Sequence, residues 1–197
     1  MANICCSQYV VEGEMSELKD LYEKMKSLEE GTAPVVDAAE DNTWVANLIN
    51  LLGGDWQNIE CRGSFYEVKL DEARGLLTYN IESKWIELDE VRDFISEQYP
   101  SLTIYFRAEE PGCDIFETND LESKYFERHK VGYYNVDWER VELYFFTQEE
   151  MFAKMNELMG VNVGSIEEMQ REFEDYNSDS DVELCYNYFE EPSPNLF

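Results

Sequence analysis

Few residues in this chain of 197 amino acids are suited to nucleophilic or metal chemistry. There is a single histidine, His129, between Arg128 and Lys130 in the stretch FERHKVG. Catalysis by Ser–His or Cys–His needs the imidazole beside a nucleophile and an orienting acid, and most zinc hydrolases use several histidines. The basic neighbours instead predict a solvent-facing histidine or one at a hairpin. We therefore assign no catalytic residue, and an enzyme is the less favoured class.

The cysteines also fit a structural role. They are Cys5, Cys6, Cys61, Cys113 and Cys185. Their odd number argues against a disulfide framework, and they do not form the C-x₂₋₄-C pairs typical of structural zinc. If the opening CCSQYVV is a strand, Cys5 and Cys6 point to opposite faces and cannot bind one ion together. We expect reduced thiols that pack as small hydrophobic residues, and no cofactor.

One acidic stretch, DYNSDSDVELCY at residues 175–186, partly matches a calcium-binding loop. Positions 1, 3, 5 and 7 of an EF-hand loop would be Asp175, Asn177, Asp179 and Asp181. However, Ser180 replaces the glycine that makes the sharp turn, and Tyr186 replaces the final bidentate glutamate. We expect an acidic loop between a helix and a strand, with at most a weak divalent-cation site.

The charge of the chain restricts its partners. It contains 44 Asp and Glu against 15 Lys and Arg, a formal net charge of −29. Nucleic acids and anionic membranes repel such a chain, because proteins bind both through Lys and Arg. A basic protein is the favoured partner, and the oligomeric state is left open. The sequence lacks the pattern of a secretion signal and of a membrane span, so we expect a cytoplasmic protein.

The acidic residues are densest near the carboxyl end. From Val141 onward, fourteen Asp and Glu accompany two bases, Lys154 and Arg171, a net charge of −12 over 57 residues. Such carboxylates can imitate duplex DNA, which carries about one charge per 1.7 Å. The alternative is that they only keep the protein in solution. The residues predicted to bind a basic partner are Glu167, Glu168, Glu172, Glu174, Asp175, Asp179, Asp181 and Glu183.

Apolar periodicity predicts the elements that carry these residues. Strands are expected at 2–12, on both sides of a turn at DEARG, and around Pro111-Gly112. Helices are expected at 15–31, 43–54 and 87–100. The order is β-α-(α)-β-β-α-β-β, the split β-α-β plan of a ferredoxin-like sandwich. The predicted fold class is therefore α+β, with helices on one face of an antiparallel sheet.

The last third of the chain is predicted to extend this core. We place the core at residues 1–120 and an acidic, aromatic-rich α/β extension at 121–197. Two strands are expected over 124–146, then a helix with a capping box formed by Thr147 and Glu150. A second helix follows Ser165, and a closing strand covers 182–189. We expect the extension to pack on the same sheet, so that the chain forms one compact unit.

Two stretches carry a recognisable pattern: the opening MANICCSQYVVEG, and GLLTYNIESKWIELDEVRDFISEQYPSLTIYFRAEEPGCDIFETN. The second has its characteristic residues at Gly75, Glu82, Trp85, Tyr99, Pro100, Glu110 and Gly112. In these features the chain resembles a family of ferredoxin-like proteins carried by phages and plasmids, often labelled YubB-like or named after a protein of an aphid-endosymbiont phage. The resemblance covers residues 1–120 in pieces. It implies a ferredoxin-like core and a mobile-element origin, and it implies no site residue.

These observations favour a non-enzymatic, acidic interaction protein that binds a basic protein, for example a nucleic-acid-binding one, by charge mimicry. One alternative is a hydrolase or transferase that uses carboxylates with a divalent metal. Another is a structural or oligomerising module. An exposed carboxylate surface would support the first, a deep pocket with converging acids the second, and an exposed sheet edge the third.

Overall fold

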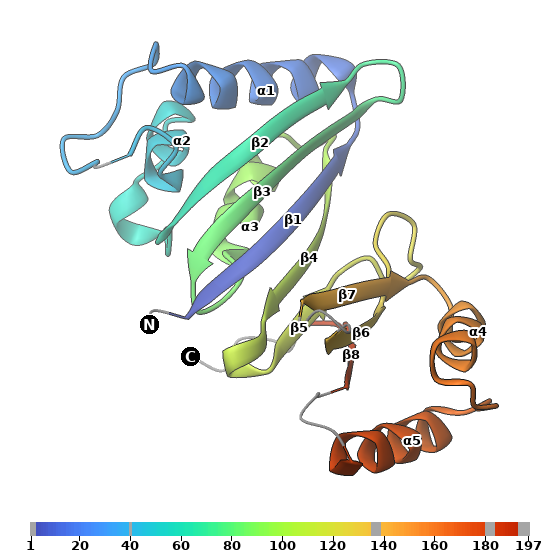
Figure 1. The fold of residues 1–197 in the computed structure, drawn as a ribbon. Helices are drawn as coiled ribbons and strands as arrows, with labels where there is room; N and C mark the ends of the chain where they lie inside the picture. Colours follow the sequence, from blue (N-terminus) through green and yellow to red (C-terminus); the bar gives the residue numbers. More distant parts are fainter. Residues whose placement is uncertain (1–2, 40, 135–138, 180–183, 193–197) are drawn as a thin grey trace. The chain divides into compact units, whose positions relative to one another are not determined.

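A computed structural model of the chain describes residues 3–39, 41–134, 139–179 and 184–192, with only the backbone described for 176–179. The protein is α+β, and it divides into two compact units, Met1–Asn119 (unit 1) and Asp120–Phe197 (unit 2). Figure 1 shows that each unit has its own sheet and its own helices.

Unit 1 is built on a five-stranded antiparallel sheet. Its strands are β1 (Ile4–Glu12), β2 (Gly63–Asp71), β3 (Leu76–Lys84), β4 (Thr103–Glu110) and β5 (Ile115–Thr118). They lie in the order β2-β3-β1-β4-β5, and all neighbouring pairs are antiparallel. The first strand of the sequence is therefore the central strand of the sheet, which explains why the chain is apolar almost from its beginning.

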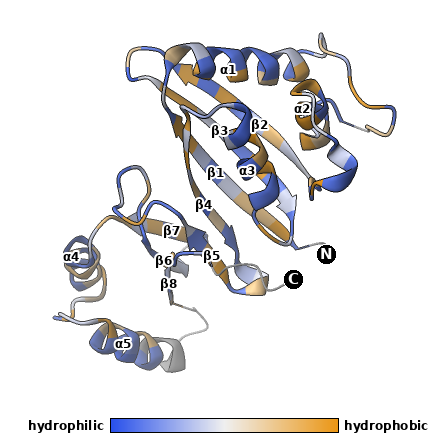
Figure 2. Cartoon of the chain, turned by 180° about the vertical axis from the view of Figure 1, so that it is seen from behind, coloured by the Kyte–Doolittle hydropathy of each residue, from blue (hydrophilic) through white to orange (hydrophobic). Residues whose placement is uncertain are grey.

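Helices cover one face of this sheet (Figures 1 and 2). They are α1 (Met15–Glu29), α2 (Val45–Leu51) and α3 (Asp89–Gln98), with short 3-10 turns η1 (Trp56–Asn58) and η2 (Pro111–Cys113). The core between helices and sheet includes four buried residues of α1, at spacings of three and four: Leu18, Leu21, Met25 and Leu28. Burying each such side chain contributes about 1.5–3 kcal/mol, so this amphipathic face holds α1 against the sheet.

The strands alternate between a helix-covered face and an opposite face, as a period of two requires. Cys5 is fully buried on the covered face and Cys6 is exposed, which confirms that the two thiols point in opposite directions. All five cysteines are reduced thiols. Burial raises the pKa of Cys5 to about 12, so this thiol stays protonated and packs as a small hydrophobic residue.

Unit 2 is built on a three-stranded antiparallel sheet of its own. Its strands are β6 (His129–Tyr134), β7 (Arg140–Phe145) and β8 (Cys185–Tyr188), in the order β7-β6-β8. Its helices are α4 (Gln148–Met159) and α5 (Ile166–Asp179). Their buried Met151, Met155, Met169 and Phe173 join Val131 of the central strand in a second core. The expectation of one compact unit is corrected: the last third has its own sheet and its own core because its apolar residues bury one another.

Capping residues in unit 2 begin and end its helices at the positions that the sequence predicts. Thr147 and Glu150 form the expected capping box, since the Thr147 hydroxyl accepts from the Glu150 N–H and the Glu150 carboxylate accepts from the Thr147 N–H. α4 ends at Gly160, whose φ of +70° is the left-handed geometry that glycine adopts without strain. The Ser165 hydroxyl accepts from the Glu168 N–H at 3.2 Å, which caps the start of α5.

Candidate functional site

The helix α5 carries the acidic residues predicted to meet a partner. Ile166, Met169 and Phe173 lie on its inner side and pack in the second core. The outer side is exposed and holds Glu167, Glu168, Glu174 and Asp175, with one base, Arg171, among them. We call these four carboxylates the α5 acidic face. The 3.6-residue period of the helix therefore separates apolar from charged residues, and Figure 2 shows α5 coloured largely hydrophilic.

The other predicted partner-binding residues divide into two groups. Glu172 is half-buried at the border between the two sides of α5. Asp179 is the last residue of α5, and its side chain is not among those described. Asp181 and Glu183 lie outside the described residues. The structure thus brings four of the eight predicted carboxylates together on one exposed surface.

The prediction of an acidic loop from residue 175 onward is wrong for residues 175–179. The backbone is helical through Asp179, so Asp175, Asn177 and Asp179 belong to a helix. An EF-hand site needs a non-helical loop that folds around the ion, and the described geometry does not supply one there. The remaining candidate, Asp181, lies outside the described residues. Among the residues that the structure describes, no cluster of three His, Cys, Asp or Glu side chains could hold a metal ion.

Two carboxylates of the α5 acidic face also stabilise their own helix. Glu167 and Glu168 lie in the first turn, where the helix dipole favours negative charge. Glu168 also accepts a hydrogen bond from the Gly164 N–H at 2.9 Å. Glu174 and Asp175 lie two turns further on, at about 1.5 Å per residue, where the dipole no longer explains an acid. The helix dipole therefore favours acids at Glu167 and Glu168 and does not extend to Glu174 and Asp175.

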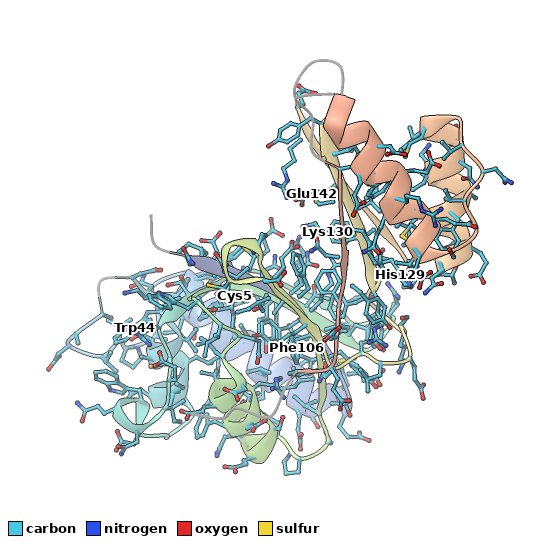
Figure 3. All side chains as sticks on the ribbon, turned by 90° about the horizontal axis from the view of Figure 1, so that it is seen from below. Cys5, Trp44, Phe106, His129, Lys130 and Glu142 are labelled. Carbon is cyan, nitrogen blue, oxygen red and sulfur yellow. The ribbon has the colours of Figure 1, made fainter. Side chains whose placement is uncertain are left out.

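One base of unit 2, Lys130, is buried, and it shares a carboxylate with the exposed Arg140. Lys130 on β6 is 2% exposed at its side chain, and its ammonium lies 3.1 Å from a carboxylate oxygen of Glu142 on β7 (Figure 3). The same ammonium lies 5.3 Å from the ring centre of Tyr144, and Arg140 Nε pairs with Glu142 at 3.0 Å. Burial alone would raise the pKa of Glu142, but Lys130 and Arg140 outweigh it and lower that pKa. One carboxylate thus engages two of the bases of unit 2.

The single histidine is buried, which corrects the expectation that it faces solvent. His129 begins the central strand β6 and is 6% exposed. Its Nδ1 lies 2.9 Å from the Tyr186 hydroxyl, and its ring packs 5.0 Å from that of Tyr188. Burial, and then the charge of Arg128, lower the pKa of His129, while burial raises the pKa of Tyr186 to about 12. Both groups are neutral at pH 7, and they pack as an aromatic cluster.

Unit 1 holds a buried acid that sequence reasoning missed. Glu87 is 5% exposed, the Tyr9 hydroxyl donates to its Oε1 at 2.8 Å, and Arg92 Nε donates to the same oxygen at 3.2 Å. Burial raises the pKa of Glu87, against the opposing charge of Arg92. The Arg92 guanidinium also lies 4.8 Å over the Phe106 ring. These groups satisfy one another, as in a structural ion pair. The signal in the sequence is the spacing of five residues between Glu87 and Arg92 at the start of a predicted helix.

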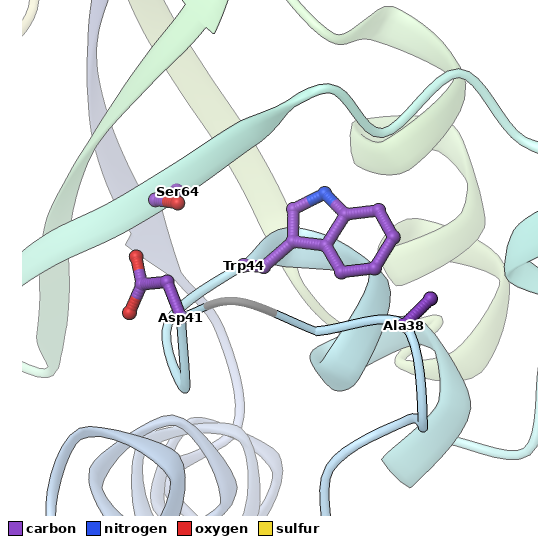
Figure 4. A pocket seen from close by; sticks show the side chains of 4 residues that line it. All are labelled: Ala38, Asp41, Trp44 and Ser64. Carbon is purple, nitrogen blue, oxygen red and sulfur yellow. The ribbon is translucent and has the colours of Figure 1, made fainter.

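A pocket of about 320 Å³ opens beside strand β2 of unit 1 (Figure 4). It is lined by Ala38, Asp41, Trp44 and Ser64. The Trp44 side chain is held in place, because its Nε1–H donates to the Cys61 carbonyl at 2.8 Å and its ring makes an edge-to-face contact with Trp56, 5.2 Å between ring centres. A backbone bridge pairs Trp44 with Ser64 and fastens the preceding loop to the edge strand. Residues 32–42 lie between the helices expected at 15–31 and 43–54, and the sequence predicted no site there.

Asn47 sets the shape of the loop over this pocket. It is fully buried at the inner side of α2. Its amide nitrogen donates to the carbonyls of Asp41 and Asn42, at 2.9 and 3.0 Å, and its Oδ1 accepts from the Val36 N–H at 2.9 Å. One buried side chain therefore satisfies three backbone groups of the loop. The loop conformation, and with it the position of Asp41, is determined by α2.

A second hollow, of about 290 Å³, lies between α5 and β8. It is lined by Gln170, Phe173, Glu174, Leu184 and Tyr186. Glu174 thus belongs both to the α5 acidic face and to the rim of this hollow. The hydroxyl of Tyr186, the amide of Gln170 and the carboxylate of Glu174 at this hollow suit polar contacts with a partner side chain.

Comparison of the chain with protein-family models, with curated proteins and with solved structures finds no match. The function proposed below therefore rests on the geometry of the chain. No helix among the described residues has the length and apolar character needed to cross a membrane.

Proposed function

We propose that the protein is a non-enzymatic, acidic interaction protein that binds a basic partner, for example a nucleic-acid-binding protein, through the α5 acidic face. The observation that carries this proposal is the exposure of four carboxylates on one side of one helix. Glu174 is the strongest part of the argument, because it lies beyond the first turn, where the dipole of α5 no longer favours an acid. The burial of Lys130, which pairs with Glu142, keeps this base from offsetting that surface.

The physical basis is a long-range field combined with short-range pairing. A net charge of −29 raises the local concentration of cationic partners and speeds their encounter. Pairing then requires carboxylates that a partner can reach, which the outer side of α5 presents. Because solvent separates these charges from a partner until contact, ionic strength should weaken binding steeply. A positively charged groove shaped for DNA phosphates is the kind of surface that fits this description.

For unit 1 we propose a ferredoxin-like fold and kinship with the phage- and plasmid-borne family that its sequence resembles. The strand order β2-β3-β1-β4 supports a split β-α-β plan. Pattern residues have roles in the fold: Gly75 adopts a φ of +67° in the β2–β3 turn, the Tyr99 hydroxyl donates to Asp20 at 2.6 Å, and Glu110 caps η2. Five reduced thiols support a cytoplasmic location.

A capture experiment tests the interaction. The tagged protein is incubated with lysate of its source cell at about 50 mM and about 200 mM salt, a range over which charge-driven binding falls strongly. We expect a basic protein to be retained at the lower salt and released at the higher one. The double variant Glu167→Gln/Glu174→Gln should retain less of it. The matched control is Glu23→Gln/Glu97→Gln, which removes two exposed glutamates from α1 and α3 of unit 1.

Two outcomes would contradict the proposal. One is the absence of any basic protein that is retained at low salt. The other is equal retention by the α5 variant and the control variant. In the described part of the chain, the lack of a three-residue metal cluster gives no support to the alternative of a metal-dependent hydrolase.

A further inference from the structure

We infer that the pocket lined by Trp44 and Asp41 in unit 1 is a binding site for an arginine side chain presented by a peptide or protein. Trp44 would contact the guanidinium with its ring, and Asp41 would accept a hydrogen bond from it. The inference concerns unit 1 only and does not rest on the proposal for the α5 acidic face.

The first argument is the pairing of an aromatic ring with a carboxylate. Figure 4 shows the indole of Trp44 lying between Ala38 on one side and Asp41 and Ser64 on the other, with the carboxylate group of Asp41 on the Ser64 side of the pocket. An indole face attracts cations, and Trp does so better than Tyr or Phe. A carboxylate beside it adds a charged acceptor for the same cation. Neither an anion nor an uncharged metabolite would gain from both groups.

The second argument is that the carboxylate is fixed and charged. Asp41 Oδ1 accepts from the Thr43 N–H and its Oδ2 accepts from the Thr43 hydroxyl, both at 2.9 Å. Burial opposes the charge, but these bonds and a hydrogen bond from the Ser64 side chain outweigh it and lower the pKa of Asp41. A carboxylate offers about four lone-pair sites, so it can accept from a ligand as well. Because Thr43 already orients it, binding costs little additional ordering.

The third argument is size and surroundings. At about 320 Å³ the pocket is at the lower end of the range for ligand sites, which suits one side chain better than a whole cofactor. The described part of the loop, residues 32–39 and 41–43, contains Asp37 and Asp41 and no Lys or Arg, so its own charge favours a cation. Arginine is preferred to lysine because a planar guanidinium can stack on the indole and still donate to Asp41.

Titration with small probes tests the inference. The full chain is labelled with ¹⁵N, and the indole N–H signal of Trp44 is assigned by its loss in Trp44→Phe. The probes are N-acetyl-arginine amide, the lysine equivalent, and the citrulline equivalent, which has the shape of arginine without its charge. We expect a saturable shift of the Trp44 signal with arginine, a weaker response with lysine, and no saturable shift with citrulline.

Three variants give the test its specificity. Asp41→Asn keeps an acceptor for Thr43 and removes the charge, so arginine should bind about tenfold more weakly, as for loss of one charged hydrogen bond. Asp37→Asn removes the same charge from the exposed part of the same loop, and it should change binding less than twofold. Ala38→Leu fills the pocket without a change of charge and should abolish the shift.

Several results would overturn the inference. The absence of a saturable shift with arginine would do so, as would equal responses to arginine and citrulline. Equal effects of Asp41→Asn and Asp37→Asn would show diffuse attraction rather than a site. Tighter binding of lysine than of arginine would reject the stacked guanidinium. Since the readout lies in unit 1, these results are separate from any result on the α5 acidic face.

Discussion

The two units have similar charge densities, but they place their bases differently. Unit 1 has 25 acids and 9 bases, a net charge of −16 over 119 residues, and unit 2 has 19 acids and 6 bases, −13 over 78 residues. The excess of negative charge is therefore shared by both units. Net charge alone does not identify a binding surface.

In unit 1, exposed acids are offset locally by exposed bases. Surface ion pairs join Lys19 to Glu72, Lys24 to Asp20, Arg62 to Glu60 and Lys69 to Glu67. In unit 2, Lys154 forms a similar pair with Glu157, but Lys130 is buried and shares Glu142 with Arg140. The comparison shows that the placement of the few bases decides where acids remain concentrated. In unit 2 the exposed acids of α5 outnumber the one base of that helix, Arg171.

The largest effect is expected from breaking the buried ion pair of unit 1. Arg92→Ala leaves the Glu87 carboxylate buried without its cation and removes the contact over Phe106. Loss of one partner of a buried pair costs about 3–5 kcal/mol, and urea unfolding followed by the amide signals of unit 1 measures it. Arg62→Ala, which breaks an exposed pair, should change the stability little. Similar losses in the two variants would mean that Glu87 and Arg92 contribute no more than a surface pair.

A smaller loss of stability is expected from removing the shared carboxylate of unit 2. Glu142→Ala removes the carboxylate shared by Lys130 and Arg140. Because Glu142 is partly exposed and Lys130 also contacts the Tyr144 ring, we expect unit 2 to lose about 1.5–3 kcal/mol. Urea unfolding followed by the signals of β6 measures the loss. The control Glu157→Ala should have little effect, and an unchanged unit 2 in Glu142→Ala would refute an organising role for this carboxylate.

Acidification should affect the two units with opposite sign. The pKa of His129 is lowered by burial, so below about 6.5 the unfolded chain is protonated first and unit 2 loses stability as pH falls. The pKa of Glu87 is raised by burial, so the folded state takes up its proton first and unit 1 gains stability as pH falls toward about 4.5. Urea unfolding of each unit at several pH values checks the signs. The variant His129→Gln should flatten the slope of unit 2, and an unaltered slope would contradict this explanation.

The smallest effect concerns a strained residue of unit 1. Trp85 has a φ of +82°, which a side chain with a Cβ adopts only at a cost, and it is 57% exposed. Trp85→Gly should therefore raise the stability of unit 1 by up to about 1 kcal/mol, because glycine adopts this conformation freely. Thermal unfolding measures the change. Thr78→Gly, at a half-buried position within β3, should instead lower the stability. A loss in Trp85→Gly would show that its packing outweighs the strain.

Much of the fold could be predicted because its signals are local. The period of α1, the capping box at Thr147 and Glu150, and the opposite faces of Cys5 and Cys6 depend on residues close in sequence. The prediction of a loop from residue 175 onward was wrong, because α5 continues to Asp179. Asn, Ser and Asp favour turns, yet a helix that already packs against a core continues through them.

The sites were harder to predict because they depend on tertiary contacts. The basic neighbours of His129 suggested solvent, but β6 is the central strand of its sheet, and Tyr186 and Tyr188 of the neighbouring β8 pack against the imidazole. The Trp44 pocket joins residues from a connector and from an edge strand, Asp41 and Ser64, that no sequence spacing relates. The α5 acidic face could be predicted, because the helical period that separates its acids from its apolar residues is visible in the sequence.

The most direct test is the salt dependence of the affinity for the captured basic partner. Dissociation constants are measured over a range of salt concentrations for the unmodified protein, Glu167→Gln/Glu174→Gln and Glu23→Gln/Glu97→Gln. We predict that the α5 variant binds about tenfold more weakly at low salt and has a shallower slope of log Kd against log salt, while the control stays within about twofold. Equal weakening by the two variants would mean that the charge acts diffusely, and the α5 acidic face would then not be the binding surface.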